Sequence, residues 1–193
     1  MIRYLRKTSY SKLTDEEIMC LVGEKQDEKA FKELYNRHAR RLMGFFLRTF
    51  NYNNEEAADA CQEVFLKVWH TAARFHTTST FRPWLYTIAY NYARSKFRHS
   101  EQEQRYLLEQ IATTKEDYEE ANELQLDNAT LLNALEKVLQ TLPSECRTLF
   151  ALRYEEELSI KQVAQVLNIA EGTVKSKIHR LLCYLKQQLH DYE

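Results

Sequence analysis

The sequence predicts an all-α protein of two small helical domains joined by an acidic linker. Its 193 residues include only three glycines and two prolines, and the strong helix formers Leu, Ala, Glu, Lys and Gln are abundant. Charge is distributed unevenly. Residues 1–100 hold 17 Lys and Arg against 11 Asp and Glu, residues 101–128 hold 2 against 9, and residues 129–193 hold 8 against 8. We therefore expect domains at 1–100 and 129–193. Composition alone also fits an ordinary solvated linker at 101–128.

Composition argues against several protein classes. The sequence holds no apolar run near the roughly 18 residues that a membrane span needs, and its N-terminus lacks a signal-peptide core. We expect no membrane insertion and a cytoplasmic location. The cysteines are far apart and form no Cys-x-x-Cys pair, which argues against structural zinc and a disulfide framework. We expect no metal, no cofactor, and reduced, mostly buried thiols at Cys20, Cys61, Cys146 and Cys183.

Residues 14–50 predict two helices. Thr14 with Glu17 offers a capping box for the first, and Asp27 can cap a second that begins near Glu28. An apolar stripe runs along this second helix: Phe31, Leu34, Tyr35, Leu42, Phe45 and Phe46.

The next helix begins near Asn53, which with Glu56 offers another start signal. One face should be buried: Cys61, Val64, Phe65 and Val68. The other face should see solvent: Asp59, Gln62, Glu63, Leu66 and His70. A lone exposed leucine usually carries no meaning, but Leu66 beside two carboxylates and an amide also fits a contact patch for a basic, partly apolar partner helix.

Residues 77–99, TTSTFRPWLYTIAYNYARSKFRH, are dense in aromatics and cations. Pro83 suits the first turn of a helix, where its missing N–H costs nothing. Helical projection places Leu85, Ile88 and Tyr92 inward with Trp84 at the edge, and it places Tyr86, Tyr90 and Phe97 outward among Arg82, Arg94 and Arg98. Outward rings interleaved with arginines suit single-stranded nucleic acid. The alternative is that these rings pack under a neighbouring helix.

Residues 159–182, SIKQVAQVLNIAEGTVKSKIHRLL, predict a helix-turn-helix. Ser159 and Gln162 form a capping box, Ala164 permits close approach, and Asn168 suits a left-handed turn. The second helix opens at Gly172. The inward side of this helix should hold Val174, Ile178, Leu181, Leu182 and Leu185. The outer side should hold Thr173, Ser176, Lys177, Arg180 and Tyr184. Hydroxyls and cations suit phosphates and base edges, although many helix pairs with a polar face bind nothing.

Four segments in this order resemble the extracytoplasmic-function (ECF) sigma factors of the sigma-70 family, the small promoter-recognition subunits of bacterial RNA polymerase. They are AFKELYNRHARRL (30–42), DACQEVFLKVW (59–69), TFRPWLYTIAYNYARSKFR (80–98) and LPSECRTLFALRYEEELSIKQVAQVLNIAEGTVKSKIHRLLCYL (142–185). The resemblance implies a region 2-like bundle at 1–100 and a region 4-like helix-turn-helix bundle at 129–193. It also implies a linker that runs through polymerase channels built for polyanions.

The resemblance also implies three sets of contact residues. The set that docks on the clamp of the largest subunit of core RNA polymerase is Asp59, Gln62, Glu63 and Leu66. The set that recognises and opens the minus-ten promoter element, with a flipped base held in the loop from His76 to Phe81, is His76, Thr77, Thr78, Ser79, Phe81, Arg82, Trp84, Tyr86, Tyr90, Asn91, Arg94 and Arg98. The set that reads the minus-thirty-five element is Thr173, Lys175, Ser176, Lys177, His179 and Arg180.

The chain departs from the family pattern at a few positions. Ser95 stands where Asp is usual, and Asn168 stands where Gly is common. Ala170 replaces a Ser or Pro, so a side-chain cap is absent before the recognition helix, and Glu171 offers partial compensation through the helix dipole. The resemblance implies core RNA polymerase and promoter DNA as partners. An anti-sigma factor, which holds many members inactive, is a further candidate partner.

Two other functions fit parts of the sequence. A conventional helix-turn-helix regulator would act on duplex DNA without polymerase, but it would need a ligand-binding or phospho-acceptor domain, and residues 1–100 show neither a Gly-rich loop nor a βα alternation. An enzyme would use the carboxylates that precede His70, namely Glu55, Glu56, Asp59 and Glu63. Metal sites of that kind need a second helix with a Glu-x-x-His pair, and the sequence has none.

Overall fold

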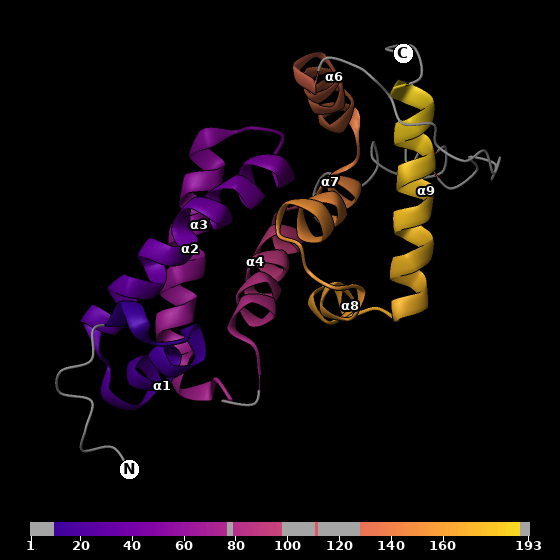
Figure 1. Cartoon of the computed structure of the whole chain (residues 1–193). Helices are drawn as coiled ribbons and strands as arrows, with labels where there is room; N and C mark the ends of the chain where they lie inside the picture. Colours follow the sequence, from indigo (N-terminus) through magenta and orange to yellow (C-terminus); the bar gives the residue numbers. More distant parts are fainter. Residues whose placement is uncertain (1–9, 77–78, 98–110, 112–127, 190–193) are drawn as a thin grey trace.

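The computed structural model describes residues 10–76, 79–97, 111 and 128–189, and every element within them is a helix (Figure 1). The all-helical prediction is confirmed. The N-terminal helices are η2 (Tyr10–Lys12), α1 (Asp15–Lys25), α2 (Glu28–Thr49), α3 (Asn54–Thr71), η3 (Ala72–Arg74) and α4 (Phe81–Phe97). The C-terminal helices are α6 (Asn128–Thr141), α7 (Ser144–Phe150), the π-helical turn η4 (Ala151–Glu155), α8 (Ile160–Leu167) and α9 (Glu171–Leu189).

The predicted start signals of α1, α2 and α3 are all confirmed. Thr14 and Glu17 form a reciprocal capping box at the start of α1. The Asp27 carboxylate accepts the backbone N–H groups of the first turn of α2 at 3.0 Å, and Asn53 accepts the Glu56 N–H at 3.1 Å. Each cap satisfies donors that a helix leaves without an internal partner.

The apolar stripes of α2 and α3 meet in the N-terminal core. Leu34, Phe45 and Phe46 of α2 pack with Val64 and Phe65 of α3, and all five are buried. The predicted stripe was wrong in one respect. Tyr35 is 44% exposed, although its ring centroid lies 4.8 Å from that of Phe65.

The helix-turn-helix is confirmed in its local geometry. Ser159 and Gln162 form the capping box of α8, and Asn168 ends that helix with φ 53° and ψ 49° in the left-handed region. Val174, Ile178, Leu181 and Leu185 of α9 are buried as predicted. The prediction for Leu182 was wrong, because α9 presents this side chain at the surface with 43% exposure.

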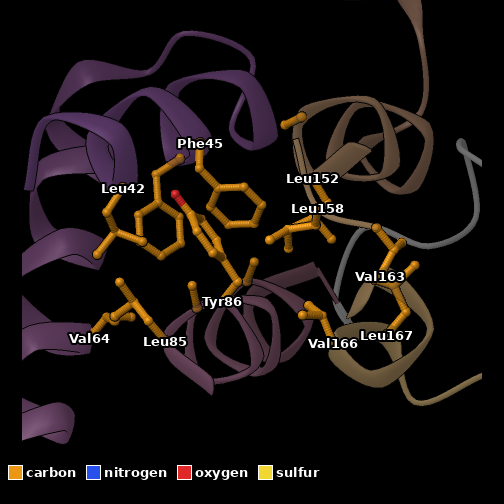
Figure 2. Packing of buried hydrophobic residues seen from close by; sticks show 14 of the residues in the cluster. Leu42, Phe45, Val64, Leu85, Tyr86, Leu152, Leu158, Val163, Val166 and Leu167 are labelled. Atoms are coloured by element: carbon orange, nitrogen blue, oxygen red, sulfur yellow. The ribbon is translucent and has the colours of Figure 1, made fainter. Parts of the chain in front are cut away.

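The N-terminal and C-terminal helices pack directly against each other and share one hydrophobic core. In Figure 1, α4 lies between α2 and α3 on one side and α7 and α8 on the other. Figure 2 shows Tyr86 of α4 among Phe45 of α2 and Leu158, with Val166 of α8 nearby. We call this packing the closed arrangement. Most of the predicted acidic linker, 101–128, lies outside the described residues. Within 101–127 only Ile111 is described, and it is buried.

Arg147 of α7 joins the two groups of helices through backbone contacts. Its guanidinium donates to the carbonyl oxygens of Arg48 at 2.9 Å and Thr49 at 3.2 Å, and also to that of Leu142. The first two are carbonyls at the C-terminal end of α2, which lack helical partners and carry partial negative charge. Burial lowers the pKa of Arg147, but these acceptors surround the guanidinium with oxygen.

The cysteine environments match the expected thiols in part. Cys61 and Cys146 are buried, whereas Cys20 and Cys183 are half-buried, and all four are free thiols outside any disulfide. Burial raises the pKa of Cys61 to about 11 and that of Cys146 to about 12, so both stay protonated at neutral pH. Within the described part of the chain, no helix combines the length and the apolar character that crossing a membrane requires.

Replacing Arg147 should destabilise the closed arrangement strongly. Arg147→Met keeps much of the buried stem but leaves two buried carbonyls and one half-buried carbonyl without their donor, so we expect the free energy of unfolding to fall by about 3 kcal/mol. Urea denaturation followed by circular dichroism measures this. Lys137→Met, at an exposed position of α6, is the control and should change stability little. Equal stabilities of the two variants would contradict the assigned role.

Candidate nucleic-acid and protein interfaces

The outer face of α9 carries the predicted duplex-DNA contacts. Four of these side chains are exposed: Thr173, Lys175, Ser176 and Arg180. Lys177 and His179 are half-buried. The turn before α9 is held by the Ile169 N–H, which donates to the Ala164 carbonyl at 3.1 Å. The arrangement presents a row of hydroxyls and cations on one rigid helix.

Lys177 is engaged within the C-terminal helices. Its ammonium lies 2.6 Å from the Glu145 carboxylate of α7, and both side chains are partly exposed. Exposed ion pairs of this kind contribute little, about 0–1 kcal/mol, so a phosphate can compete for the lysine. Arg180 is the more accessible cation of the two and has the planar donor geometry that base edges and phosphates require.

The departures from the family pattern have local consequences. No side chain caps α9 from Ala170; its backbone carbonyl accepts the Val174 N–H at 3.1 Å, and Glu171 places a carboxylate in the first turn. Ser95, where Asp is usual, donates its hydroxyl to the Tyr92 carbonyl at 2.7 Å. Ser95 therefore bonds within α4 rather than to another helix.

The predicted minus-ten residues fall into three groups by exposure. His76, Asn91 and Arg94 are exposed, and Ser79, Arg82, Trp84 and Tyr90 are half-buried. Phe81 and Tyr86 are buried. Thr77, Thr78 and Arg98 lie outside the described residues. The structure thus brings most of this set together along α4 and the connection before it, but it does not leave the whole set open to solvent.

The predicted outward orientation of Tyr86 is wrong for the closed arrangement. The side chain is 1% exposed, and its ring centroid lies 5.3 Å from that of Phe45. Burial, together with the neighbouring Glu156 carboxylate, raises the pKa of Tyr86. The helical projection placed Tyr86 outward, and it could not anticipate that Phe45 of α2 and the segment that includes Glu156 cover this ring. The alternative of packing under a neighbouring segment applies here.

Tyr90 and Phe97 are also partly covered. Burial, with the Glu145 carboxylate nearby, raises the pKa of Tyr90. The Phe97 ring packs against Phe50 at the end of α2, with centroids 5.5 Å apart. Only part of the expected aromatic face is therefore accessible.

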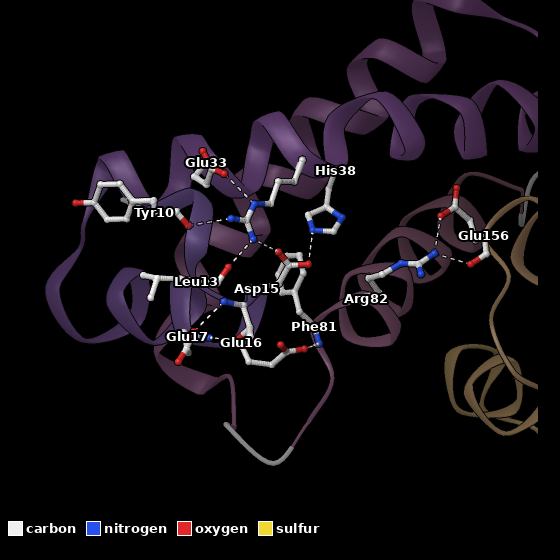
Figure 3. Close-up of polar contacts among 12 residues, drawn as sticks. Tyr10, Leu13, Asp15, Glu16, Glu17, Glu33, His38, Phe81, Arg82 and Glu156 are labelled. Atoms are coloured by element: carbon white, nitrogen blue, oxygen red, sulfur yellow. Dashed lines mark hydrogen bonds and ion pairs between the residues drawn. The ribbon is translucent and has the colours of Figure 1, made fainter. Parts of the chain in front are cut away.

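Arg82 is held by the same segment of the C-terminal helices. Its Nη2 donates to the Glu156 backbone carbonyl and to the Glu156 carboxylate, the latter at 3.2 Å (Figure 3). Glu156 is only 4% exposed, and the Arg82 Nε is buried without a hydrogen-bond partner. One donor of this arginine is therefore left unsatisfied in the closed arrangement.

The acidic face of α3 borders a hollow. Asp59, Gln62 and Glu63 are exposed, and Leu66 is 53% exposed, as predicted. A hollow of about 550 Å³ lies between α3 and α4, lined by Glu56, Asp59, Gln62, Glu63, Tyr92 and Lys96. We call it the α3–α4 groove.

Sequence reasoning missed three residues of the α3–α4 groove, Glu56, Tyr92 and Lys96. The spacing of Tyr92 and Lys96, one helical turn apart, was the available signal, and the Lys96 ammonium lies 5.7 Å from the centre of the Tyr92 ring. Their position opposite α3 could not be read from the sequence. Among the described residues, no cluster of three or more His, Cys, Asp or Glu side chains is placed to hold a metal ion.

Two family models match the chain. The model for Sigma-70 region 2 matches residues 34–103, and the model for Sigma-70, region 4 matches residues 132–182. A solved structure of CnrH in complex with the cytosolic domain of CnrY has the same fold, with a TM-score of 0.64 at 23% identity over 93% of this chain and 99% of that chain.

Curated relatives match along most of their length. The ECF RNA polymerase sigma factor SigW of Bacillus subtilis is 29% identical, with 87% of this chain and 93% of the relative covered. The ECF RNA polymerase sigma-E factor of Haemophilus influenzae is 31% identical, with 87% of this chain and 91% of the relative covered. With both regions in order and this coverage, the chain belongs to the ECF sigma factors, which are not enzymes and which direct promoter recognition by RNA polymerase.

Proposed function

We propose a division of labour within this sigma factor. Residues 1–100 dock on core polymerase and recognise and open the minus-ten element, residues 129–193 read the minus-thirty-five element, and residues 101–128 connect them inside polymerase. The observation that carries the proposal is that the α3–α4 groove and the exposed face of α9 lie on separate helices, so polymerase and duplex DNA can be bound together. Run-off transcription with purified core polymerase tests it, because a conventional regulator confers no initiation on core.

The proposed minus-thirty-five reader is the exposed row on α9. Its hydroxyls and cations project from a helix whose start is fixed by the α8–α9 turn, and such a helix fits the major groove. Arg180 has the accessible guanidinium in this row and is the proposed base contact.

Arg180→Ala should weaken minus-thirty-five recognition. If the guanidinium contacts a base with two donors, its loss should cost about 1–3 kcal/mol of binding and relax the preference at one position. Holoenzyme binding to a duplex carrying the minus-thirty-five element, and to single-base variants of it, measures both effects. Lys137→Ala removes one positive charge from α6 and is the matched control. If Arg180→Ala changes neither the affinity for the duplex nor the base preference, Arg180 is not the base contact.

The proposed polymerase contact is the α3–α4 groove with Leu66 beside it. Carboxylates around a solvent-exposed leucine suit a partner surface that is basic at its rim and apolar at its centre. The clamp of the largest polymerase subunit is the proposed partner, with Asp59, Gln62, Glu63 and Leu66 as contacts.

Glu63→Lys should block assembly with core polymerase without unfolding the chain. A reversed charge facing a basic partner is repulsive, so we expect core binding to weaken by about tenfold or more. Fluorescence anisotropy of labelled protein titrated with core polymerase measures the affinity. Glu24→Lys makes the same charge change at an exposed site on α1 and should assemble normally. Normal assembly of Glu63→Lys, with an unaltered circular dichroism spectrum, would refute the docking site.

Promoter opening by this protein needs no covalent chemistry. Unstacking and unpairing a base costs a few kcal/mol. Each base stacked on an aromatic platform returns about 1–3 kcal/mol, so capture of a few bases biases the duplex towards opening. Trp84 and Tyr90 are the proposed platforms, and Asn91 and Arg94 are the exposed polar groups beside them.

The closed arrangement should make the isolated chain a weak promoter binder. Glu156 occupies Arg82 and lies beside Tyr86, so two proposed minus-ten residues are already engaged. We propose that core polymerase holds the two domains apart at the separation of the promoter elements. Two tethered contacts then reinforce each other through effective concentration.

Glu156→Gln should release part of this inhibition. An amide replaces a charge-assisted partner of Arg82 with a weaker neutral one, so the isolated chain should bind single-stranded minus-ten DNA about three- to tenfold more tightly. The holoenzyme should change little. Glu157→Gln, at the exposed neighbouring residue, changes the net charge by the same amount and should leave the affinity for this DNA as in the wild type. Matching affinities for the two variants would show that Glu156 does not restrain Arg82.

Location and regulation belong to the same proposal. We place the protein in the cytoplasm, because bacterial RNA polymerase acts there. The solved complex of the sigma factor RpoE from Bartonella quintana with the anti-sigma factor NepR has a related fold, with a TM-score of 0.62 at 24% identity. An anti-sigma factor is therefore a candidate partner here, and copurification from native cells tests it.

A further inference from the structure

Helix α1 contacts the chain on both sides of the connection between η3 and α4, residues 75–80. On the first side, α1 approaches the backbone of η3 at Gly23. A Cβ at this position would lie 2.7 Å from the Ala72 carbonyl oxygen and 3.3 Å from the Ala73 Cα. Both are backbone atoms that cannot rotate away. Only glycine permits this approach, so α1 lies directly on the segment that leads into the connection.

On the second side, α1 holds the start of α4. The Glu16 carboxylate accepts the Phe81 backbone N–H at 2.8 Å, across 65 residues of sequence (Figure 3). Phe81 is the first residue of α4, and Pro83 in the same turn has no N–H. A carboxylate at this end accepts a backbone N–H that has no partner within the helix. Its negative charge also lies at the positive end of the helix dipole. Glu16 thus caps α4 from another helix.

The start of α1 is itself held by α2. Asp15 contacts the His38 Nε2 at 2.7 Å and accepts from the Arg37 Nη1 at 2.9 Å, and Arg37 also donates to the backbone carbonyls of Leu13 and Tyr10. Burial opposes ionisation of Asp15, but the bonds from His38 and Arg37 hold its pKa below the ordinary value. Glu16, the next residue, therefore projects from a helix start that these contacts hold in place.

Aromatic packing joins the same two ends. The His38 ring lies 5.0 Å from the Phe81 ring. Phe75, at the start of the connection, packs edge to face against Phe81 at 6.3 Å and against Trp84 at 5.3 Å. These contacts leave little freedom to Phe75 and Phe81.

We propose that α1 is a positioning element for minus-ten recognition, with Glu16 and Gly23 setting the separation of the two ends of the connection that captures the flipped base. This inference rests on the proposed role of residues His76 to Phe81. The match to Sigma-70 region 2 covers residues 34–103, so α1 with Glu16 and Gly23 lies outside it, whereas the residues that these two contact lie inside it. Ile18, Met19 and Val22 bury α1 in the core, which means that the Glu16 bond can be removed without removing the helix.

The test uses holoenzyme and two fluorescent probes from one promoter, which is selected by transcription of a randomised library. One probe is a single-stranded oligonucleotide with the minus-ten element, and the other is a duplex with the minus-thirty-five element. Glu16→Ala should weaken binding of the first probe by about five- to tenfold, the scale of the net contribution of one ordinary hydrogen bond. Binding of the second probe should not change. A general loss of folded protein would weaken both probes equally, and that result would overturn the inference.

Two further variants separate positioning from charge. Glu16→Gln keeps an oxygen that can accept the Phe81 N–H, so it should recover most of the lost minus-ten binding. Glu24→Ala removes a carboxylate from the exposed side of the same helix and should bind both probes as the wild type does. Equal losses for Glu16→Gln and Glu16→Ala, or for Glu24→Ala and Glu16→Ala, would also overturn the inference.

A third arm distinguishes the inference from the function on which it rests. His76→Ala alters the connection itself at an exposed residue and should weaken the minus-ten probe. If His76→Ala weakens that probe and Glu16→Ala does not, α1 is not a positioning element although the proposed capture site stands. If His76→Ala has no effect, the proposed capture site fails, and the inference fails with it.

Discussion

The packing of α4 between two groups of helices is the constraint on which the rest of the structure depends. Leu85 and Ala89 are buried, and Tyr86 is covered from the far side by the segment that includes Leu158. A helix that is apolar on two sides needs two partners, and here the second partner is the C-terminal part of the same chain. Two of the side chains proposed to meet promoter DNA, Arg82 and Tyr86, therefore also join the two parts.

Polar contacts across this packing use opposite charges from the two parts. Arg48 of α2 pairs with Glu136 and Glu155 at 2.9 Å and 2.6 Å, and Arg82 pairs with Glu156. The basic N-terminal part is thus neutralised locally by carboxylates from a part that is neutral as a whole. Several of these side chains remain partly exposed, so the pairs are screened by salt and open to competition from phosphates. The closed arrangement combines a firm apolar contact with replaceable charge contacts.

Local signals in the sequence predicted the helices and their starts, because a cap depends on residues two or three positions apart. Thr14, Asp27, Asn53 and Ser159 all cap as expected. The burial of Tyr86 could not be predicted, because its neighbours, Phe45 of α2 and the segment that includes Leu158, lie far away in the chain. The hydrogen bond from the Phe81 N–H to Glu16 could not be predicted either, because it also joins residues far apart in the chain. Periodicity tells which side of a helix is apolar, whereas the neighbour that covers it is a property of the whole fold.

The accessibility of the two proposed N-terminal surfaces implies an order of events. Glu63 and Leu66 are exposed beside the α3–α4 groove, whereas Arg82 and Tyr86 are engaged with the C-terminal helices. Tyr92 and Lys96 line the groove from the same α4, but on the side that faces α3. Polymerase can therefore dock without first displacing the C-terminal helices, while promoter DNA cannot reach the whole minus-ten set until they move. Docking before opening follows from which side of α4 each partner needs.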